Sequence, residues 1–234
     1  MQEIRNKILN LIWENKISTT EVADVLGKTG ALKGILPVNP RHFRVGEVVF
    51  MYAYKESNWE LHEQIANIDC ADKIVYIHGL ECADRSIIGD LMSKYLFLYK
   101  RCKAIVINAP MRDAHTIIKE NYPIWCMSVS PIGCMNVKNE TLPPEEILAP
   151  LRKKFDRGIM VCDDSGVVII EEEQLNEDFI EKLKFIELQE DIWFFCIDTL
   201  KMSTYEVVCL KKYLSENLVD KEKLLQLSKF TTAH

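Results

Sequence analysis

Short apolar runs that alternate with helical segments constrain the fold of this chain more than any other feature. Residues 103–108 (KAIVIN) form a β-branched run that is typical of a strand buried on both faces. Similar runs predict strands over 48–54, 73–78 and 125–129, with helices over 58–68, 86–101 and 115–120 between them. This alternation predicts βαβ units around a partly parallel sheet, and therefore an α/β fold.

Helices are predicted at both ends of the chain. Apolar residues at helical spacing predict a helix over 1–17, and Ser18 to Glu21 forms a capping box that opens a second helix. A β-hairpin is predicted over 158–170, with Asp163-Asp164-Ser165-Gly166 as its turn. We therefore expect an N-terminal helix (1–17), a central domain (18–175) and a C-terminal helical extension (176–234).

Charge and hydropathy exclude several classes of protein. The chain of 234 residues carries 29 basic and 35 acidic side chains, a net charge of −6. Its densest basic group, Arg152 to Lys154, is interpreted as a solvated helix face, so no nucleic-acid partner is expected. No apolar run reaches the roughly 18 residues that span a bilayer, and the N-terminal residues Met1 to Arg5 do not have the layout of a signal peptide. We expect a cytoplasmic protein without a membrane partner, whose eight cysteines are free thiols.

The common phosphate-binding and hydrolase motifs are missing from the sequence. There is no GxGxxG, no GxxxxGK[ST], no GxSxG and no HExxH. The five histidines are dispersed and lack the spacing of a zinc site. His78, which ends an apolar strand, is interpreted as a hydrogen-bonded core histidine.

Two short segments could carry chemistry. Gly89 and Asp90 open a helix, where free backbone N–H groups bind anions and a glycine lets a ligand approach closely. The simpler interpretation, an ordinary helix start with a favourable carboxylate, is preferred on these residues alone. Arg112 and Asp113 follow a buried strand, where open α/β sheets bind ligands, although they could equally form a surface ion pair.

Taken together, the two segments describe one chemistry. Arginine offers a planar fork for a carboxylate, and aspartate is a hard oxygen ligand suited to Mg²⁺. An anion-binding helix start, Arg112 and two carboxylates without a histidine cluster fit a centre that binds a 2-oxo acid and stabilises its enolate.

Four segments of the chain resemble the RraA-like superfamily, namely 18–27, 72–79, 89–113 and 158–170. This superfamily includes 4-hydroxy-4-methyl-2-oxoglutarate aldolases, which also decarboxylate oxaloacetate, and regulators of ribonuclease activity. The resemblance implies a single α/β domain of the swivelling β/β/α type. It also implies a homotrimer or homohexamer with sites between subunits.

The resemblance also implies roles for individual residues. Arg112 would bind substrate, Asp113 would hold Mg²⁺ or Mn²⁺, and Asp90 would belong to the metal–water shell. Backbone amides that bind the pyruvate-like end would come from Gly89, Asp90, Leu91 and Met92. A glutamate from a neighbouring subunit completes the site in aldolase members, and Glu187 or Glu190 could be that catalytic residue.

The chain departs from the family pattern at several positions, which bear on the substrate more than on the fold. The acid and the Arg-Asp pair are separated by 21 residues, where the family has 20. Thr116 replaces a frequent acid, and Asn108-Ala109 replaces an Asp-Gly pair. A helix that begins with prolines replaces the strands expected between Cys134 and Gly158.

The function expected from the resemblance is that of a divalent-metal-dependent lyase. It would cleave a C–C bond of a 2-oxo acid by retro-aldol reaction or decarboxylation and release pyruvate or a relative. One alternative is a non-catalytic regulator that binds a ribonuclease or another protein. Regulator members typically lack the metal-binding aspartate, so Asp113 favours the enzyme. A second alternative is a biosynthetic enzyme that uses the same metal site on a different substrate.

Overall fold

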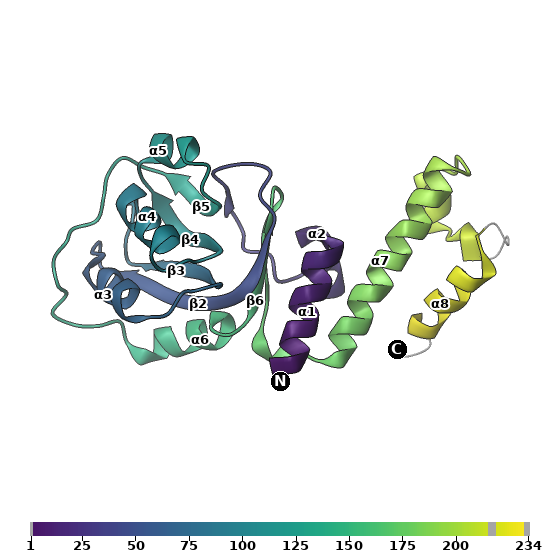
Figure 1. The fold of residues 1–234 in the computed structure, drawn as a ribbon, viewed down its shortest axis with the longest axis horizontal. Coiled ribbons are helices and arrows are strands. Elements are labelled where there is room, and N and C mark those ends of the chain that lie inside the picture. The colour runs from purple at the N-terminus through teal and green to yellow at the C-terminus, as the bar shows by residue number, and fades with distance from the viewer. Residues whose placement is uncertain (1, 215–218, 232–234) are drawn as a thin grey trace. The chain divides into compact units, whose positions relative to one another are not determined.

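The computed structural model describes residues 2–214 and 219–231, with side chains described up to residue 228. The chain divides into two compact units, Met1–Leu175 and Asn176–His234, which are treated separately (Figure 1). Within the described residues, no helix is both long enough and apolar enough to cross a membrane.

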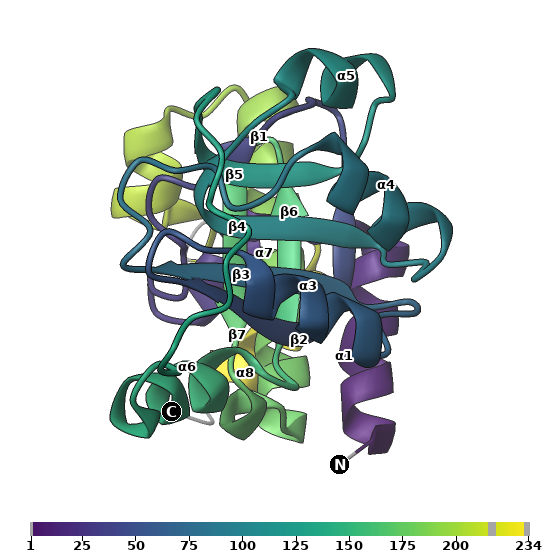
Figure 2. The same cartoon turned by 90° about the vertical axis from the view of Figure 1, so that its left-hand side faces the viewer.

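A seven-stranded sheet organises the first unit (Figure 2). Its strands are β1 (Leu36–Pro37), β2 (Arg44–Tyr54), β3 (Ile74–Leu80), β4 (Ala104–Met111), β5 (Ile124–Val129), β6 (Ile159–Asp163) and β7 (Gly166–Ile170). Their order is β1-β5-β4-β3-β2-β6-β7, with parallel pairing from β2 to β5 and antiparallel pairing elsewhere. The parallel part confirms the βαβ units predicted from the sequence.

Strand β2 belongs to both halves of this sheet. Its first half, Arg44 to Glu47, pairs with β6, and its second half, from Val48, pairs with β3. The sheet curves until its two edge strands, β1 and β7, approach each other. The chain just before β1 is bonded to β7: the Leu32 amide donates to the Val167 carbonyl at 2.9 Å, and Ala31 pairs with Val168. The α/β fold class predicted for the chain is confirmed.

Helices cover the two faces of the sheet differently. The helices of the first unit are α1 (Gln2–Asn15), α2 (Thr19–Val25), α3 (Trp59–Asn67), α4 (Asp90–Leu98), α5 (Ala114–Lys119) and α6 (Glu145–Phe155). One core cluster joins α3, α4 and α5 to side chains such as Val75 and Ile77 of β3. A second cluster joins α6 to the opposite face through Tyr76 and Phe155, whose rings stack 4.0 Å apart.

The N-terminal segment is held by its caps and by one buried arginine. The predicted capping box forms, since Ser18 and Glu21 exchange side-chain-to-backbone hydrogen bonds. The hairpin residue Asp163 also accepts from the Thr19 amide at 2.8 Å and from its hydroxyl at 2.7 Å. On α1, the buried Arg5 guanidinium donates to Glu172 at 3.0 Å and so ties this helix to the end of the unit.

The predicted helix start at Gly89 and Asp90 is confirmed, but the predicted range of 86–101 is too long at both ends, because α4 spans Asp90–Leu98. Residues 86–88 are extended instead: the Ser86 amide donates to the Ile132 carbonyl, and the Ile88 carbonyl accepts from the Arg112 amide. Strand β4 likewise continues through Met111, where the sequence predicts a loop after Asn108. Both differences arise from hydrogen bonds between segments distant in the sequence, which local patterns do not report.

The second unit consists of helices. They are α7 (Glu177–Asp198), a short π-helix (Tyr205–Cys209), a 3₁₀ turn (Lys212–Leu214) and α8 (Lys221–Thr231). Its own core contains Ile192, Cys196, Val207, Tyr213, Val219 and Leu227.

Candidate functional site

A cavity of about 170 Å³ lies between the start of α4 and the residues that follow the carboxyl end of β4. All the candidate site residues of the first unit line it: Gly89, Asp90, Leu91, Met92, Arg112 and Asp113. The extended segment 86–88 brings the two groups together, since it pairs with β4 through an Ile88–Met111 bridge just before α4 begins. Two segments separated by about twenty residues therefore form one site.

Gly89 is required by the close approach of Asp113 and Arg112. A Cβ atom at position 89 would lie closer than 3.0 Å to Asp113 Oδ2, and at 3.0 Å and 3.1 Å from Arg112 Cγ and Nε. The backbone of Gly89 is extended (φ −140°, ψ −162°), so conformational strain is not what demands a glycine here. The requirement is for space beside the Asp113 carboxylate.

Asp113 adopts the left-handed conformation (φ 61°, ψ 30°), which aspartate tolerates better than most residues. This conformation directs its carboxylate back toward α4, where Oδ2 accepts from the Asp90 amide at 3.2 Å. The same oxygen lies 3.4 Å from Arg112 Nε. One oxygen of Asp113 thus contacts both the helix start and the guanidinium.

The helix start is less open than the sequence predicts. The Asp90 amide donates to Asp113, and the Leu91 amide donates to Asp90 Oδ1 at 2.7 Å. Both amides are therefore already bonded to carboxylates. Carboxylates are favoured at this position because the start of a helix carries a partial positive charge. An incoming anion would have to replace a carboxylate in order to use them.

Asn58 is a site residue that the sequence analysis missed. Its amide nitrogen donates to the Ile87 carbonyl at 3.2 Å, while its Oδ1 is buried and has no hydrogen-bond partner. The residue is 9% exposed and lines the cavity. A buried acceptor without a partner is costly, so it marks a position where a ligand donor would be favoured. In the sequence, Asn58 is marked only as the start of a predicted helix.

The segment 130–136 closes the site beside Arg112. Ser86 bonds to this segment through its hydroxyl, which donates to the Ser130 carbonyl at 2.6 Å. A Cβ at Gly133 would lie 2.5 Å from Arg112 Nη1, so the guanidinium passes directly over this glycine. Cys134 also lines the cavity, and its hydrogen bond with Cys82 raises the pKa of its thiol, which is therefore neutral at pH 7.

The donor set suits a hard cation that keeps much of its water. No group of three or more His, Cys, Asp or Glu side chains among the described residues is arranged to hold a metal ion. The cavity offers the carboxylates of Asp90 and Asp113, and Mg²⁺ typically binds proteins through one or two carboxylates plus water. The Asp113 side chain is 36% exposed, so its carboxylate is accessible to a cation. These residues fit Mg²⁺ or Mn²⁺ bound through Asp113.

The two glutamates predicted to complete a site lie in the second unit. Glu187 and Glu190 both belong to α7. Their expected role depends on a neighbouring subunit and stays a prediction.

A family model described as Aldolase/RraA matches residues 19–169, most of the chain. The chain belongs to the RraA-like family. The resemblance drawn from the sequence is thereby confirmed for the region that contains Gly89, Arg112 and Asp113. The family includes both aldolases and RraA proteins, so membership alone does not choose between an enzyme and a regulator.

Comparison with individual proteins supports the same fold. The protein DlpA of Legionella pneumophila is 26% identical over 194 residues, which are 80% of this chain but only 31% of DlpA, so this chain spans about a third of that protein. An uncharacterized protein from Pseudomonas syringae has a similar structure (TM-score 0.67, 19% identity, covering 88% of this chain and 94% of that one). RraAS2 of Streptomyces coelicolor, an unusual member of the RNase ES inhibitor RraA family, is also similar (TM-score 0.59, 15% identity, covering 84% and 98%).

Proposed function

We propose that this RraA-like protein is a divalent-metal-dependent lyase that cleaves a C–C bond of a 2-oxo acid. The reaction would be the retro-aldol cleavage of a 4-hydroxy-2-oxo acid, the decarboxylation of oxaloacetate, or both. The observation that carries the proposal is the convergence of the Asp113 carboxylate, the Arg112 guanidinium and the start of α4 on Gly89. This arrangement sits in a cavity at the end of a central strand, where α/β sheets commonly bind ligands.

Asp113 would hold the cation, and Asp90 would orient water bound to it. When bound, Mg²⁺ or Mn²⁺ would supply Lewis-acid stabilisation of the negative charge that develops at the 2-keto oxygen. Arg112 would bind the substrate carboxylate through its planar fork.

In the retro-aldol reaction the 4-hydroxyl loses its proton as the C3–C4 bond breaks and a carbonyl forms at C4, and the electron pair left on C3 then takes up a proton. The Asp90 carboxylate lines the cavity and would hold the water that accepts the hydroxyl proton and returns a proton to C3; in decarboxylation only the return of a proton to C3 is needed. Asn58 Oδ1, which has no partner, would accept from the 4-hydroxyl group of a retro-aldol substrate and orient it. Oxaloacetate lacks this hydroxyl, so Asn58 should matter for aldol cleavage more than for decarboxylation.

Pyruvate release tests the proposal directly. The protein would be assayed with oxaloacetate and with 4-hydroxy-4-methyl-2-oxoglutarate, in the presence of Mg²⁺, Mn²⁺ or a chelator. We expect release that the chelator stops and that the Asp113→Asn variant lowers by at least about 100-fold. Asparagine tolerates the left-handed conformation, so this variant should fold.

The matched control is Asp72→Asn. Asp72 is another exposed aspartate in the left-handed conformation (φ 60°), and it does not line the cavity. Full activity in Asp113→Asn, or equal losses in both variants, would refute the role given to Asp113. No release from either substrate would direct the search toward the alternative of a different, biosynthetic substrate at the same site.

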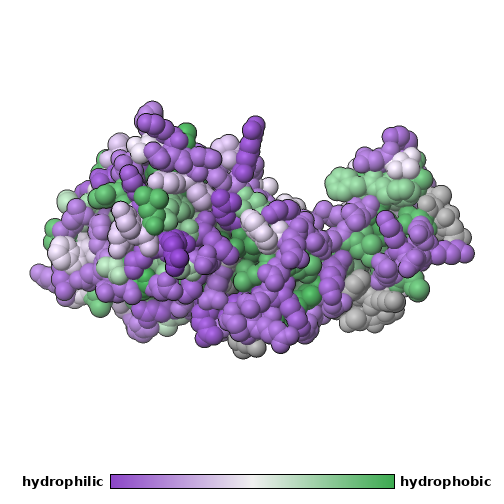
Figure 3. Space-filling model, viewed as in Figure 1, coloured by the Kyte–Doolittle hydropathy of each residue, from purple (hydrophilic) through white to green (hydrophobic). Residues whose placement is uncertain are grey.

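We also propose that the protein forms a homo-oligomer through α4. One face of this helix carries large exposed side chains at helical spacing: Leu91 (77% exposed), Tyr95 (42%), Leu98 (55%) and Tyr99 (74%). The opposite face packs into the core through Met92 and Leu96. Apolar patches interrupt the mostly polar surface of this unit (Figure 3). Because the exposed face starts at a cavity residue, a partner subunit there would lie beside the candidate site.

Light scattering on a size-exclusion column tests the oligomer. We expect a trimer or hexamer that the double substitution Leu98→Glu and Tyr99→Glu dissociates. A monomeric unmodified protein would refute it.

The exposed face of α4 also supports the alternative of a regulator that binds another protein. RraAS2 is described as a member of the RNase ES inhibitor family, and its fold is similar. Absence of lyase activity together with loss of ribonuclease inhibition in the α4 variant would favour this alternative.

A further inference from the structure

A second cavity, of about 280 Å³, lies on the other face of the sheet. Its walls come from the loop 31–35, from β3 and β4, and from α6. Alternation along β3 separates it from the candidate active site, because Tyr76 belongs to the α6 side of the sheet and Ile77 to the side that carries α4. The cavity still lies near the carboxyl ends of two parallel strands, since His78 and Asn108 are neighbours near the ends of β3 and β4.

A hydrogen-bonded group of three side chains forms the polar part of this cavity. Tyr76 Oη lies 2.9 Å from His78 Nδ1, and Asn108 Nδ2 lies closer to the same nitrogen (3.1 Å) than to His78 Nε2 (3.4 Å). An imidazole that accepts at Nδ1 carries its proton on Nε2, which can then donate to a ligand. Burial lowers the pKa of His78, so the ring is neutral at pH 7 and the lysines supply the charge of the cavity.

Two lysines give the cavity a positive charge. Lys33 and Lys154 line it, and none of its lining residues is acidic. The neighbouring cations of α6 are paired, Arg152 with Glu145 at 2.7 Å and Lys153 with Glu173 at 3.4 Å. Across the part of the chain that the structure describes, no ion pair involves Lys33 or Lys154.

The remaining walls are apolar. Ala31, Leu32, Ile35, Leu151 and Phe155 complete the lining. The Phe155 ring stacks on Tyr76, so the apolar wall adjoins the hydrogen-bonded group directly. Apolar walls with a few convergent polar groups are typical of small-molecule sites.

We propose that this cavity is a second ligand site, which binds a small organic anion with a carboxylate or phosphate group and an apolar body. Lys33 and Lys154 would neutralise the anionic group, His78 Nε2 and Asn108 would donate to it, and the apolar body would lie against Phe155. This site would also give a role to Asn108, which stands where the family pattern has an aspartate: its side chain would orient His78 toward the ligand.

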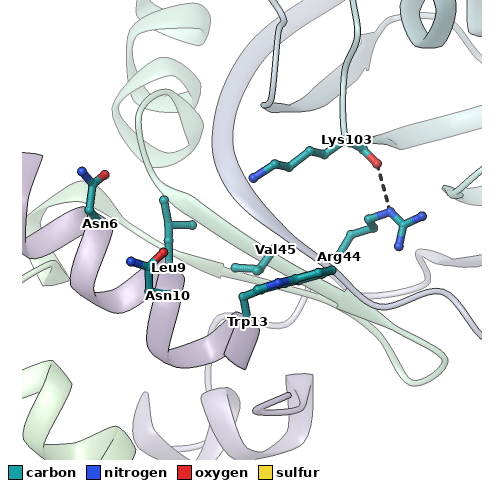
Figure 4. A pocket seen from close by; sticks show the side chains of 7 residues that line it. All are labelled: Asn6, Leu9, Asn10, Trp13, Arg44, Val45 and Lys103. Carbon is teal, nitrogen blue, oxygen red and sulfur yellow. Dashed lines mark hydrogen bonds between the residues drawn. The ribbon is translucent and has the colours of Figure 1, made fainter. Parts of the chain in front are cut away.

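A third cavity, between α1 and β2, is the weaker candidate (Figure 4). It also contains an arginine and a lysine, Arg44 and Lys103. However, Arg44 Nε donates to the Lys103 carbonyl at 3.2 Å and Nη1 donates to the Phe43 carbonyl at 2.8 Å. Its guanidinium is thus held by the backbone. Among the described residues, neither lysine of the second site is bonded to a carboxylate or a carbonyl, and Lys154 Nζ lies 5.6 Å from the centroid of the Phe155 ring, inside the site itself.

Binding is tested by NMR of the protein labelled at histidine, with benzoate and phenyl phosphate as anionic probes and benzyl alcohol as the neutral one. The His78 signal would be assigned with the His78→Gln variant. We expect a saturable shift of this signal with at least one anion, and at least about tenfold weaker binding of benzyl alcohol. Tighter binding of benzoate would identify a carboxylate site, and tighter binding of phenyl phosphate a phosphate site.

Matched lysine variants localise the effect. The double variant Lys33→Gln and Lys154→Gln should weaken binding at least about tenfold. Lys153→Gln, one residue away on α6 but outside the lining, should change it less than about twofold. Arg112→Ala should leave the His78 shift intact, so the result is independent of the lyase proposal. No saturable His78 shift, equal effects of Lys153 and Lys154, or loss of the shift in Arg112→Ala would overturn the second site.

Discussion

Gly89→Ala is the sharpest perturbation of the candidate site. The added methyl group would lie closer than 3.0 Å to Asp113 Oδ2, a separation that real Cβ atoms essentially never show. Because the backbone at Gly89 is extended, alanine is conformationally allowed there. The substitution therefore acts on the site and not on the chain's ability to fold.

The size of the effect follows from the distances. The Asp113 carboxylate must move by roughly 1 Å to reach ordinary contact at 3.4 Å, and a 1 Å misplacement in a site can cost about 100-fold in rate. The movement also removes the hydrogen bond from the Asp90 amide, and loss of such an orienting partner typically lowers metal affinity by about 10- to 100-fold. Unfolding free energy should fall by only about 1 kcal/mol, the contribution of one hydrogen bond.

The assay combines Mn²⁺ titration by calorimetry, a thermal melt and pyruvate release from oxaloacetate. Gly133→Ala is the control, because its Cβ would meet the flexible end of Arg112 at 2.5 Å and leave Asp113 in place. We expect this control to keep Mn²⁺ affinity within about twofold and to raise the KM for the 2-oxo acid. Unchanged Mn²⁺ affinity and activity in Gly89→Ala would refute the placement of the cation at Asp113.

Three further predictions concern binding, pH and capping. Arg112→Lys keeps the charge but removes the planar fork, so steady-state kinetics should show KM for the 2-oxo acid rising by about tenfold, with kcat less affected; an unchanged KM would contradict this. Burial lowers the pKa of His78 in the folded state, so its stabilising effect is present above the unfolded value of about 6.5 and is lost as pH falls through the folded pKa. Urea unfolding should therefore lose more stability from pH 7.5 to 5 in the unmodified protein than in His78→Gln, and parallel profiles would contradict the prediction. Ser18→Ala removes the cap bond from the Glu21 amide and should cost about 1 kcal/mol in the same assay. Asp163→Ala should cost more, because it removes both bonds from Thr19 and the bond from the Ser165 amide.

Much of the framework follows from local patterns. The β-branched runs predict β3 and β4, since strands buried on both faces need continuous apolar side chains. The capping box at Ser18 and the turn after Asp163 are equally local, because each depends on residues within a few positions of one another. The pairing of Gly89 with Arg112 could be anticipated only through the rule that ligands bind at the carboxyl ends of strands, together with the family resemblance.

The tertiary structure alone decided the geometry of the two sites. The extended segment 86–88 depends on hydrogen bonds to 110–112 and 132, and these partners lie too far along the chain for a local pattern to report them. Asn58 becomes a site residue because burial leaves its Oδ1 without a partner, and burial is a property of the packed molecule. For His78, the sequence predicts a hydrogen-bonded histidine, and the structure confirms this. Its place in a positively charged cavity, in contrast, depends on the packing of α6 and the loop 31–35 beside it. Strands, helix caps and turns are thus determined by residues close together in the sequence. The cavities form only where segments far apart in the chain pack against one another.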